Sequence, residues 1–192
     1  MKVLRTMRTA SELRLTNADL EAMPEDGNRY EVIDGELYVS SAPGFIHQRI
    51  LVNMVLALGN YLSDHPIGEI APGVGVIFDD HNGVIPDLVF ATNERMRNAL
   101  IGGRFHASPD IVIEILSPGA SNERRDRHVK RSLYAARGAG EYWIVDPENR
   151  GVELYRRNES GDLVLDKSLR ENDALTSAAL PGFSVTVDKF FV

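Results

Sequence analysis

A near-continuous run of apolar residues, Ile111 to Leu116, constrains the fold more than any other part of the sequence. Such a run is typical of a β-strand that is buried on both of its faces. It carries one charged residue, Glu114, in its second half. An ionised carboxylate in that position is costly unless it is paired, hydrogen-bonded or bound to a cation. The run therefore predicts a central strand with an unusual acid within it.

A second apolar segment carries an acid in the same way. Asp87 stands between the runs 84–86 and 88–91, which hold no other charged residue. Two neighbouring central strands that contribute one acid each build an oxygen-ligand site of the kind that Mg²⁺ or Mn²⁺ occupies. The alternative is that each carboxylate caps a loop or pairs with an arginine, and the two acids taken together favour the metal site.

A second Pro-Asp pair, Pro109-Asp110, competes with Pro86-Asp87 for this role. Asp110 and Glu114 are four residues apart on one strand, which is about 13 Å at about 3.3 Å per residue. They face the same way but are too far apart to share an ion whose ligand bonds are about 2.1 Å long. Asp87, on an adjacent strand about 4.8 Å away, can share an ion with Glu114.

The rest of the pattern predicts a mixed α/β fold. Helices are expected over residues 17–23 (with Thr16 as N-cap), 46–64 and 121–137, a hairpin over 30–40, strands over 74–80, 84–91, 110–116 and 141–145, and further β elements over 152–157, 163–165 and 183–191. Asp34-Gly35 suits a type I′ turn in the hairpin because both central residues of that turn need a positive φ. No repeat or linker divides the chain, so we expect a single domain over 1–192, of which 1–29 is peripheral and 30–192 forms the main body.

Three side chains of the predicted hairpin and first long helix are open to two interpretations. His47 leads the buried stripe of the helix over 46–64, so it is either a hydrogen-bonded core histidine or a functional one. Glu31 and Glu36 share one face of the hairpin. Their carboxylates either orient a ligand or make hairpin hydrogen bonds; we expect a structural role for Glu36 and leave Glu31 open.

The segment 123–137 is strongly basic in an acidic chain. The net charge of the whole sequence is −7, whereas the basic residues of this segment outnumber its acidic ones. The basic residues are Arg124, Arg125, Arg127, Lys130, Arg131 and Arg137, and the acidic ones are Glu123 and Asp126. On a helix, Asp126, Lys130 and Tyr134 form one row at i, i+4 spacing. This row is either a solvated face with an Asp126–Lys130 ion pair or, beside two metal-binding acids, a surface that faces phosphate.

Composition excludes several classes of site. The chain has no cysteine, so disulfides, thiol catalysis and cysteine-based zinc sites are excluded, and a metal has to bind oxygen or histidine. An acidic chain lacks the broad basic surface of non-specific nucleic-acid binders, so a nucleic acid has to bind at a local patch. The longest apolar-rich stretch, 46–62, is too polar and too short for a membrane span, and we expect a soluble cytoplasmic protein that makes no membrane contact.

Six motifs follow one another in a specific order. They are Tyr30-Glu-Val-Ile-Asp-Gly-Glu-Leu37, His47 at the start of a helix, Pro86-Asp87, Glu114-Ile-Leu-Ser-Pro118, Asp126-x-x-x-Lys130-x-x-x-Tyr134 and Glu141-Tyr-Trp-Ile-Val-Asp-Pro147. From about residue 20 to the C-terminus this order resembles the Uma-two family of the restriction-endonuclease-like, PD-(D/E)XK superfamily. The resemblance implies a restriction-endonuclease-like core, a central four-stranded mixed β-sheet flanked by helices, to which the β-hairpins predicted near both ends are added.

The resemblance also implies that Asp87 and Glu114 are the metal ligands. The superfamily has a lysine two residues after the second acid, where this sequence has Leu116. In this family the lysine is moved to the following helix, which here offers Lys130. Related nucleases often draw a further acid from the first helix, and His47 occupies a comparable early position.

These features lead to two hypotheses. The first is Mg²⁺- or Mn²⁺-dependent hydrolysis of phosphodiester bonds in DNA, for which two cuts in a duplex require two sites and thus favour a homodimer. Candidate catalytic residues are Asp87, Glu114, Lys130, His47 and Glu31, and candidate contacts to the DNA backbone are Arg124, Arg125, Arg127 and Arg131. The second hypothesis is a non-catalytic nucleic-acid-binding or protein-interaction module on the same scaffold.

Overall fold

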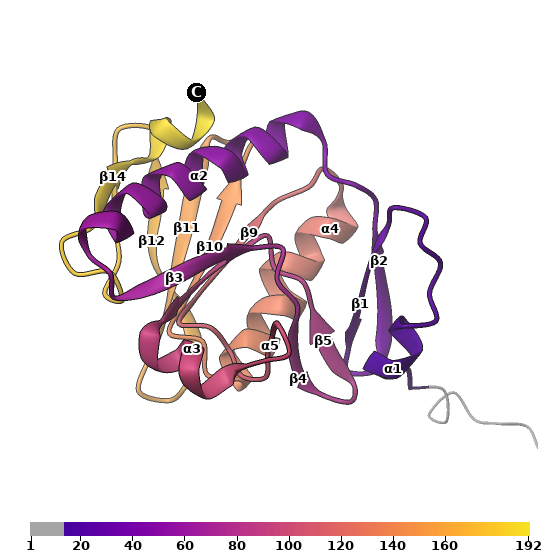
Figure 1. Cartoon of the computed structure of the whole chain (residues 1–192). Coiled ribbons are helices and arrows are strands. Elements are labelled where there is room, and N and C mark those ends of the chain that lie inside the picture. The colour runs from indigo at the N-terminus through magenta and orange to yellow at the C-terminus, as the bar shows by residue number, and fades with distance from the viewer. Residues whose placement is uncertain (1–13) are drawn as a thin grey trace, which may run out of the picture.

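In residues 14–192, the part of the chain that the computed structural model describes, the strands form two six-stranded mixed sheets and one two-stranded sheet (Figure 1). The central sheet has the order β12-β11-β10-β9-β6-β3. Its strands are β3 (Gly68–Pro72), β6 (Leu88–Thr92), β9 (Ile111–Ile115), β10 (Glu141–Asp146), β11 (Gly151–Arg157) and β12 (Leu163–Arg170). Strands β9 and β10 run parallel, and the other neighbours are antiparallel. The predicted mixed α/β fold is confirmed.

The lateral sheet has the order β2-β1-β5-β4-β8-β7. Its strands are β1 (Arg29–Ile33), β2 (Glu36–Ser40), β4 (Val76–Asp79), β5 (Asn82–Val84), β7 (Leu100–Ile101) and β8 (Arg104–Phe105). Strands β1 and β2 form the predicted hairpin, and Asp34 and Gly35 at its turn have φ of 52° and 80°. Both values are positive, as the type I′ turn requires.

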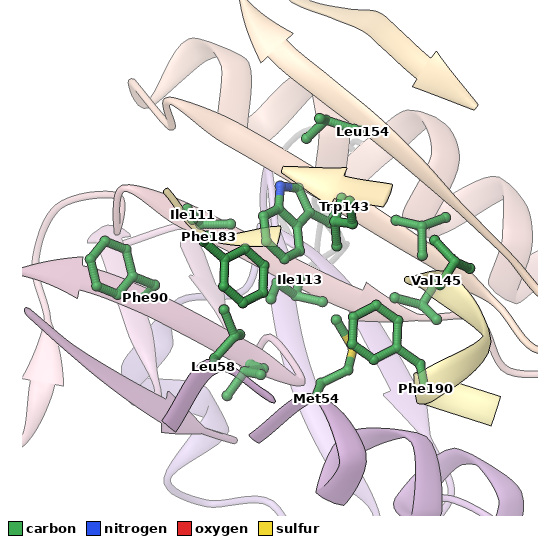
Figure 2. Close-up of a cluster of buried hydrophobic side chains, with 14 of the residues drawn as sticks. Met54, Leu58, Phe90, Ile111, Ile113, Trp143, Val145, Leu154, Phe183 and Phe190 are labelled. Atoms are coloured by element: carbon green, nitrogen blue, oxygen red, sulfur yellow. The ribbon is translucent and has the colours of Figure 1, made fainter. Parts of the chain in front are cut away.

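One face of the central sheet is covered by the long helix α2 (Phe45–Asp64) and the C-terminal 3₁₀ helix η3 (Val187–Phe191) (Figure 1). Figure 2 shows the buried cluster between them, in which Met54 and Leu58 of α2 lie with Phe190 of η3 beside the side chains of the sheet. The predicted helix over 46–64 is confirmed within one residue. Its buried positions recur every three or four residues, so one stripe of the helix faces the sheet.

The other face of the central sheet is covered by the helical segment 120–136. It consists of α4 (Ala120–Arg124), the π-helical η2 (Arg125–Lys130) and α5 (Arg131–Ala136). Leu133 and Tyr134 of α5 belong to the same buried cluster as Val112 of β9. All five residues of β9 are buried, and Ile111 and Ile113 belong to the opposite cluster, so the prediction of a strand buried on both faces is confirmed.

Three sequence predictions need correction. The expected strand over 84–91 is divided between β5 of the lateral sheet and β6 of the central sheet, because Pro86 lacks the N–H that a continuous ladder needs. The central sheet has six strands rather than four, since β3 joins one edge and β12, which extends to Arg170, joins the other. The helix over 121–137 contains the π-helical turn, which i, i+4 periodicity does not reveal.

The ends of the chain also differ from the expectation. The first helix, α1 (Asn17–Leu20), starts after the predicted N-cap Thr16 but is shorter than expected. The tail forms β13 (Ala174–Thr176), β14 (Ser184–Thr186) and η3 instead of one β element over 183–191. Residues 1–13 of the peripheral segment lie outside the described residues, and the single domain stays a prediction. None of the described helices is long and apolar enough to cross a membrane.

The packing of α2 predicts a difference between two of its leucines. Leu58 is 1% exposed and Leu56 is 56% exposed. Leu58→Ala should lower the free energy of unfolding by about 3 kcal/mol, because it leaves a cavity against the central sheet. Leu56→Ala carries the same change in helix propensity and should stay within about 0.5 kcal/mol of the wild type. Urea denaturation measures both, and equal losses would contradict the assigned face of α2.

Candidate functional site

Asp87 and Glu114 face one another where the two sheets meet. Leu88 of β6 pairs with Ile113 of β9, so Asp87, one residue before Leu88, and Glu114, one residue after Ile113, occupy the next facing positions of the ladder. Both side chains are buried, with 4% and 2% of their surface exposed. Successive side chains of a strand point to opposite faces. The two acids therefore share the face of the central sheet that the helical segment 120–136 covers.

Asp87 is held by three donors from three different elements. Arg29 of β1 donates from Nη1 to Oδ1 at 2.9 Å, and the Ile115 backbone N–H donates to Oδ2 at 2.9 Å. Nε2 of His47, in the first turn of α2, lies 3.1 Å from the same Oδ2. Burial alone would raise the pKa of Asp87, but the hydrogen bonds with His47 and Ile115 and the charge of Arg29 lower it to about 2. Asp87 is an ionised carboxylate at neutral pH.

Glu114 has a different environment. Its Oε1 accepts from Lys130 Nζ at 2.9 Å and from the Tyr134 hydroxyl at 3.2 Å. Burial, together with the neighbouring carboxylates Asp87 and Asp126, raises the pKa of Glu114 to about 8 against the opposing effect of the Lys130 charge. The two facing acids therefore differ in their affinity for a proton, and a further cation beside Glu114 would favour its ionised form.

Lys130 joins two carboxylates beneath the helical segment. Its Nζ is 2.9 Å from Glu114 Oε1 and 2.9 Å from Glu31 Oε1, and its side chain is 2% exposed. Burial lowers the pKa of Lys130, but the charges of Glu114 and Glu31 outweigh burial and raise it, so the ammonium keeps its proton. The sequence placed Lys130 in a row with Tyr134 that faces the acids, and the structure brings both to Glu114.

The two glutamates of the hairpin have separate places. Glu31 is buried; its Oε1 accepts from the Ile85 backbone N–H at 2.7 Å and forms an ion pair with Lys130. It thereby ties the crossing between the two sheets to the helical segment. Glu36 is exposed and accepts from the Tyr38 hydroxyl, which agrees with the structural role expected for it.

The π-helical turn positions a fourth buried acid, Asp126. Arg125 donates from Nε to Asp126 Oδ1 at 2.9 Å and from Nη1 to Ser40 Oγ at 2.6 Å. The Tyr142 hydroxyl donates to the Asp126 backbone carbonyl at 2.9 Å. Asp126 therefore pairs with Arg125. The Asp126–Lys130 ion pair that was expected for a solvated helix face does not form. Short π-helical turns within α-helices frequently occur at functional sites.

A small cavity of about 30 Å³ opens among these groups. Its lining contains four carboxylates, Glu31, Asp87, Glu114 and Asp126, together with Arg29, Arg125, Lys130 and His47. This volume can hold one or two water molecules or an ion of similar size. The hydrogen bonds of Glu114 and Glu31 with the described residues all end on Oε1, so Oε2 of each has acceptor capacity toward a ligand.

These oxygens fit a hard divalent cation. Mg²⁺ is usually bound by one or two carboxylates, with water and substrate completing six oxygen ligands. Within residues 14–192, no group of three or more histidine, aspartate or glutamate side chains is arranged to hold a metal ion. A cation between Asp87 and Glu114 would therefore need water and substrate for its other ligands.

The four arginines expected to contact DNA do not form one surface. Arg125 faces the cavity, Arg127 pairs with Asp146 and Glu153, and the Arg131 guanidinium lies 5.0 Å from the Tyr155 ring centroid. Arg124 is exposed and has no carboxylate partner among the described residues. Their contact with DNA stays a prediction, and Arg124 is the member most available for it.

Sequence reasoning did not identify Arg29 as a site residue. Arg29 and Asp87 are 58 positions apart and lie in different sheets, so no local pattern connects them. Arg29 directly precedes the motif Tyr30 to Leu37, and this position was the one sequence feature that could have indicated a role at the site. His47 was left open, and the structure places it against Asp87 with its other ring nitrogen, Nδ1, buried and without a partner among the described residues.

A family model and a solved structure of an 18% identical protein agree with this fold. The model of the family described as "Uma2: Putative restriction endonuclease" matches residues 18–188. A crystal structure of "a putative nuclease belonging to DUF820" from Anabaena variabilis has a TM-score of 0.73 and 18% sequence identity, covering 92% of this chain and 97% of its own. The type IIG restriction endonuclease BpuSI has a TM-score of 0.43 and 12% identity, covering 76% of this chain and 15% of its own. No curated protein matches the chain.

The raised pKa of Glu114 predicts a pH dependence of stability. Glu114 binds its proton more tightly in the folded chain, so the stability contributed by that proton is complete below its ordinary pKa of 4.5 and is lost as the pH rises through about 8. Without divalent cations, the free energy of unfolding should fall between about pH 5 and pH 8. Asp87, with a pKa of about 2, does not titrate in this range.

Urea denaturation at several pH values tests this dependence. Glu114→Gln has no proton to lose and should not show the fall, whereas Glu36→Gln, on the exposed face of the hairpin, should behave as the wild type. Parallel pH profiles for the wild type and Glu114→Gln would contradict the assignment.

Proposed function

The chain belongs to the Uma2 family, and on this premise we propose that it is a DNA endonuclease that hydrolyses phosphodiester bonds with Mg²⁺ or Mn²⁺ held by Asp87 and Glu114. The observation that carries the proposal is the convergence of three elements on one cavity. Two acids from adjacent strands line this cavity with the buried ammonium of Lys130, which is sixteen residues beyond Glu114. This is the set of charges that phosphodiester hydrolysis requires.

The bound cation would polarise a phosphoryl oxygen and lower the pKa of a water molecule. Lys130 contributes a fixed positive charge at the same place. An ammonium has three N–H donors. Lys130 Nζ lies 2.9 Å from an oxygen of Glu114 and of Glu31 and lines the cavity, where it would donate to a phosphoryl oxygen. Because these carboxylates fix the lysine beforehand, it needs no reorganisation when negative charge develops on the phosphate in the transition state.

Glu31, His47 and Arg29 act on other protein groups and are therefore proposed as positioning residues. Glu31 orients Lys130 and the backbone of Ile85. His47 and Arg29 fix the two oxygens of Asp87 in one orientation. A carboxylate that is already fixed loses no further conformational entropy when it binds a cation. Residues that hydrogen-bond to metal ligands commonly fix them in this way.

One observation favours the second hypothesis, a non-catalytic module on this scaffold. Each of the four carboxylates that line the cavity already has a cationic or imidazole partner among the described residues. Such a network can serve stability and specificity of the fold alone. The two hypotheses differ in whether the cavity turns over a phosphodiester.

Cleavage of plasmid DNA in Mg²⁺ or Mn²⁺ tests the proposal. The wild type should cut, Asp87→Asn and Glu114→Gln should lose measurable cleavage, and Lys130→Met should lose roughly 100- to 1000-fold in rate, since it removes one stabilising donor from the transition state. Asp110→Asn, at the second Pro-Asp pair, is the matched control and should retain activity. Asp110 accepts from the Thr92 N–H, outside the cavity.

Lys130→Met also leaves two buried carboxylates without their cation, which can cost several kcal/mol of stability. The double variant Glu31→Gln, Lys130→Met reduces this imbalance and provides a folded form for the assay, checked by circular dichroism. Full activity in a folded Lys130 variant would refute the role of the lysine. A purified wild type without cleavage in either metal would favour the non-catalytic module.

A further inference from the structure

Arg29 lies between the acidic cavity and a much larger groove. It lines the cavity with Asp87 and also lines a groove of about 420 Å³ formed by α1, β1, β4 and β5, which lie on one side of the molecule in Figure 1. A volume of this size is within the usual range for small-molecule sites and accommodates a nucleotide-sized group. Arg29 is therefore the residue that the groove shares with the cavity of the candidate catalytic acids.

One edge of the Arg29 guanidinium is hydrogen-bonded within the protein, and the other is not. Its Nη1 donates to Asp87 Oδ1 at 2.9 Å and to the Ile85 carbonyl at 3.2 Å. Its Nε and Nη2 have no acceptor among the described residues, and the side chain is 29% exposed. An arginine offers five N–H donors, so three of them stay available. The Nε–Nη2 edge is the fork that binds a phosphate through two parallel hydrogen bonds.

A second arginine lines this groove. Arg104 of β8 is exposed, lines the groove next to Gly75, and forms no ion pair with the described residues. Glu21 is the single carboxylate among the described residues that line the groove. The floor is apolar, with Val76 and Val84 fully or almost fully buried, and Tyr30 supplies an aromatic side chain. Cationic rims over an apolar and aromatic floor suit phosphates and bases together.

The groove on the other side of His47 has the opposite character. It is lined by the exposed Phe45 and by the carboxylates Glu123, Asp146 and Glu148. Its arginine, Arg127, is paired with Asp146 and Glu153. A polyanion approaching the cavity therefore meets the unpaired Arg104 and the free Nε–Nη2 edge of Arg29 on one side, and carboxylates on the other.

From this asymmetry we infer that the groove between Arg29 and Arg104 binds a nucleic-acid strand, seating the nucleotide next to the phosphate at Asp87 and Glu114. The inference rests on the proposed function for the identity of that phosphate. The Arg29 fork holds the adjoining phosphodiester, and Arg104 holds the next one along the strand. The groove takes a single strand, because its volume is that of one nucleotide rather than of a duplex.

Binding of a fluorescently labelled single-stranded DNA decamer to the full-length protein tests the groove, in EDTA so that no metal-dependent cleavage occurs. Arg104→Gln should weaken binding about tenfold and reduce the slope of log K against log salt by about one, as loss of a single phosphate contact does. Arg97→Gln is the matched control, since Arg97 is an exposed arginine of α3 that does not line the groove, and it should bind as the wild type. Wild-type affinity in Arg104→Gln would overturn the inference.

A second measurement locates the strand. The same decamer carrying 4-thiothymidine should form a photo-crosslink within residues 28–30 or 104, identified by mass spectrometry. Crosslinks confined to the Phe45 groove or to Arg124 would overturn the inference even if the protein cleaves DNA. Crosslinks at the groove without any cleavage in Mg²⁺ or Mn²⁺ would support the binding site and refute the nuclease. An absence of binding by the wild type would overturn the groove inference, and the plasmid assay alone would then decide on the nuclease.

Discussion

The pairing of Lys130 with Glu31 and Glu114 is the interaction on which the arrangement of the site depends. Each of these groups comes from a different part of the fold: the hairpin of the lateral sheet, a central strand and the π-helical turn. Bringing three ionisable side chains out of water costs several kcal/mol per charge unless their partners are correctly placed. The sheet junction and the helix that covers it are therefore held in one relative position by the same charges that line the cavity.

This interaction also explains how an acidic protein can present a site for a polyanion. The carboxylates at the cavity are matched by Arg29, Arg125 and Lys130, so a divalent cation would leave the region attractive to a phosphate. The helical arginines do not create this attraction, because Arg125 and Arg127 are engaged with Asp126, Asp146 and Glu153. Local pairing, rather than net charge, decides where the surface can accept a phosphodiester.

Much of the fold could be predicted from the sequence, because local rules determine it. The turn at Asp34-Gly35 and the apolar stripe of α2 depend on neighbouring residues, and the burial of β9 follows from its composition. Strand adjacency predicted that Asp87 and Glu114 come together, whereas the place of Lys130 at the site was expected from the family resemblance. The role of Arg29 and the pairing of Asp126 could not be predicted, since the first is a contact between sheets and the second depends on a π-helical turn without a sequence signal. The division of 84–91 between two sheets was also missed, although Pro86 marks the point in the sequence at which the strand is interrupted.

The central claim is that Asp87 and Glu114 form one cation site within this cavity. Crystals of the protein soaked in MnCl₂ test it most directly, because the anomalous signal of manganese locates the ion independently of any assay of activity. The account predicts an anomalous peak in contact with one oxygen of Asp87 and one oxygen of Glu114, beside a Lys130 ammonium that keeps its position. A well-ordered cavity without a peak, in which Asp87 remains bound to Arg29 and Glu114 to Lys130, would contradict it.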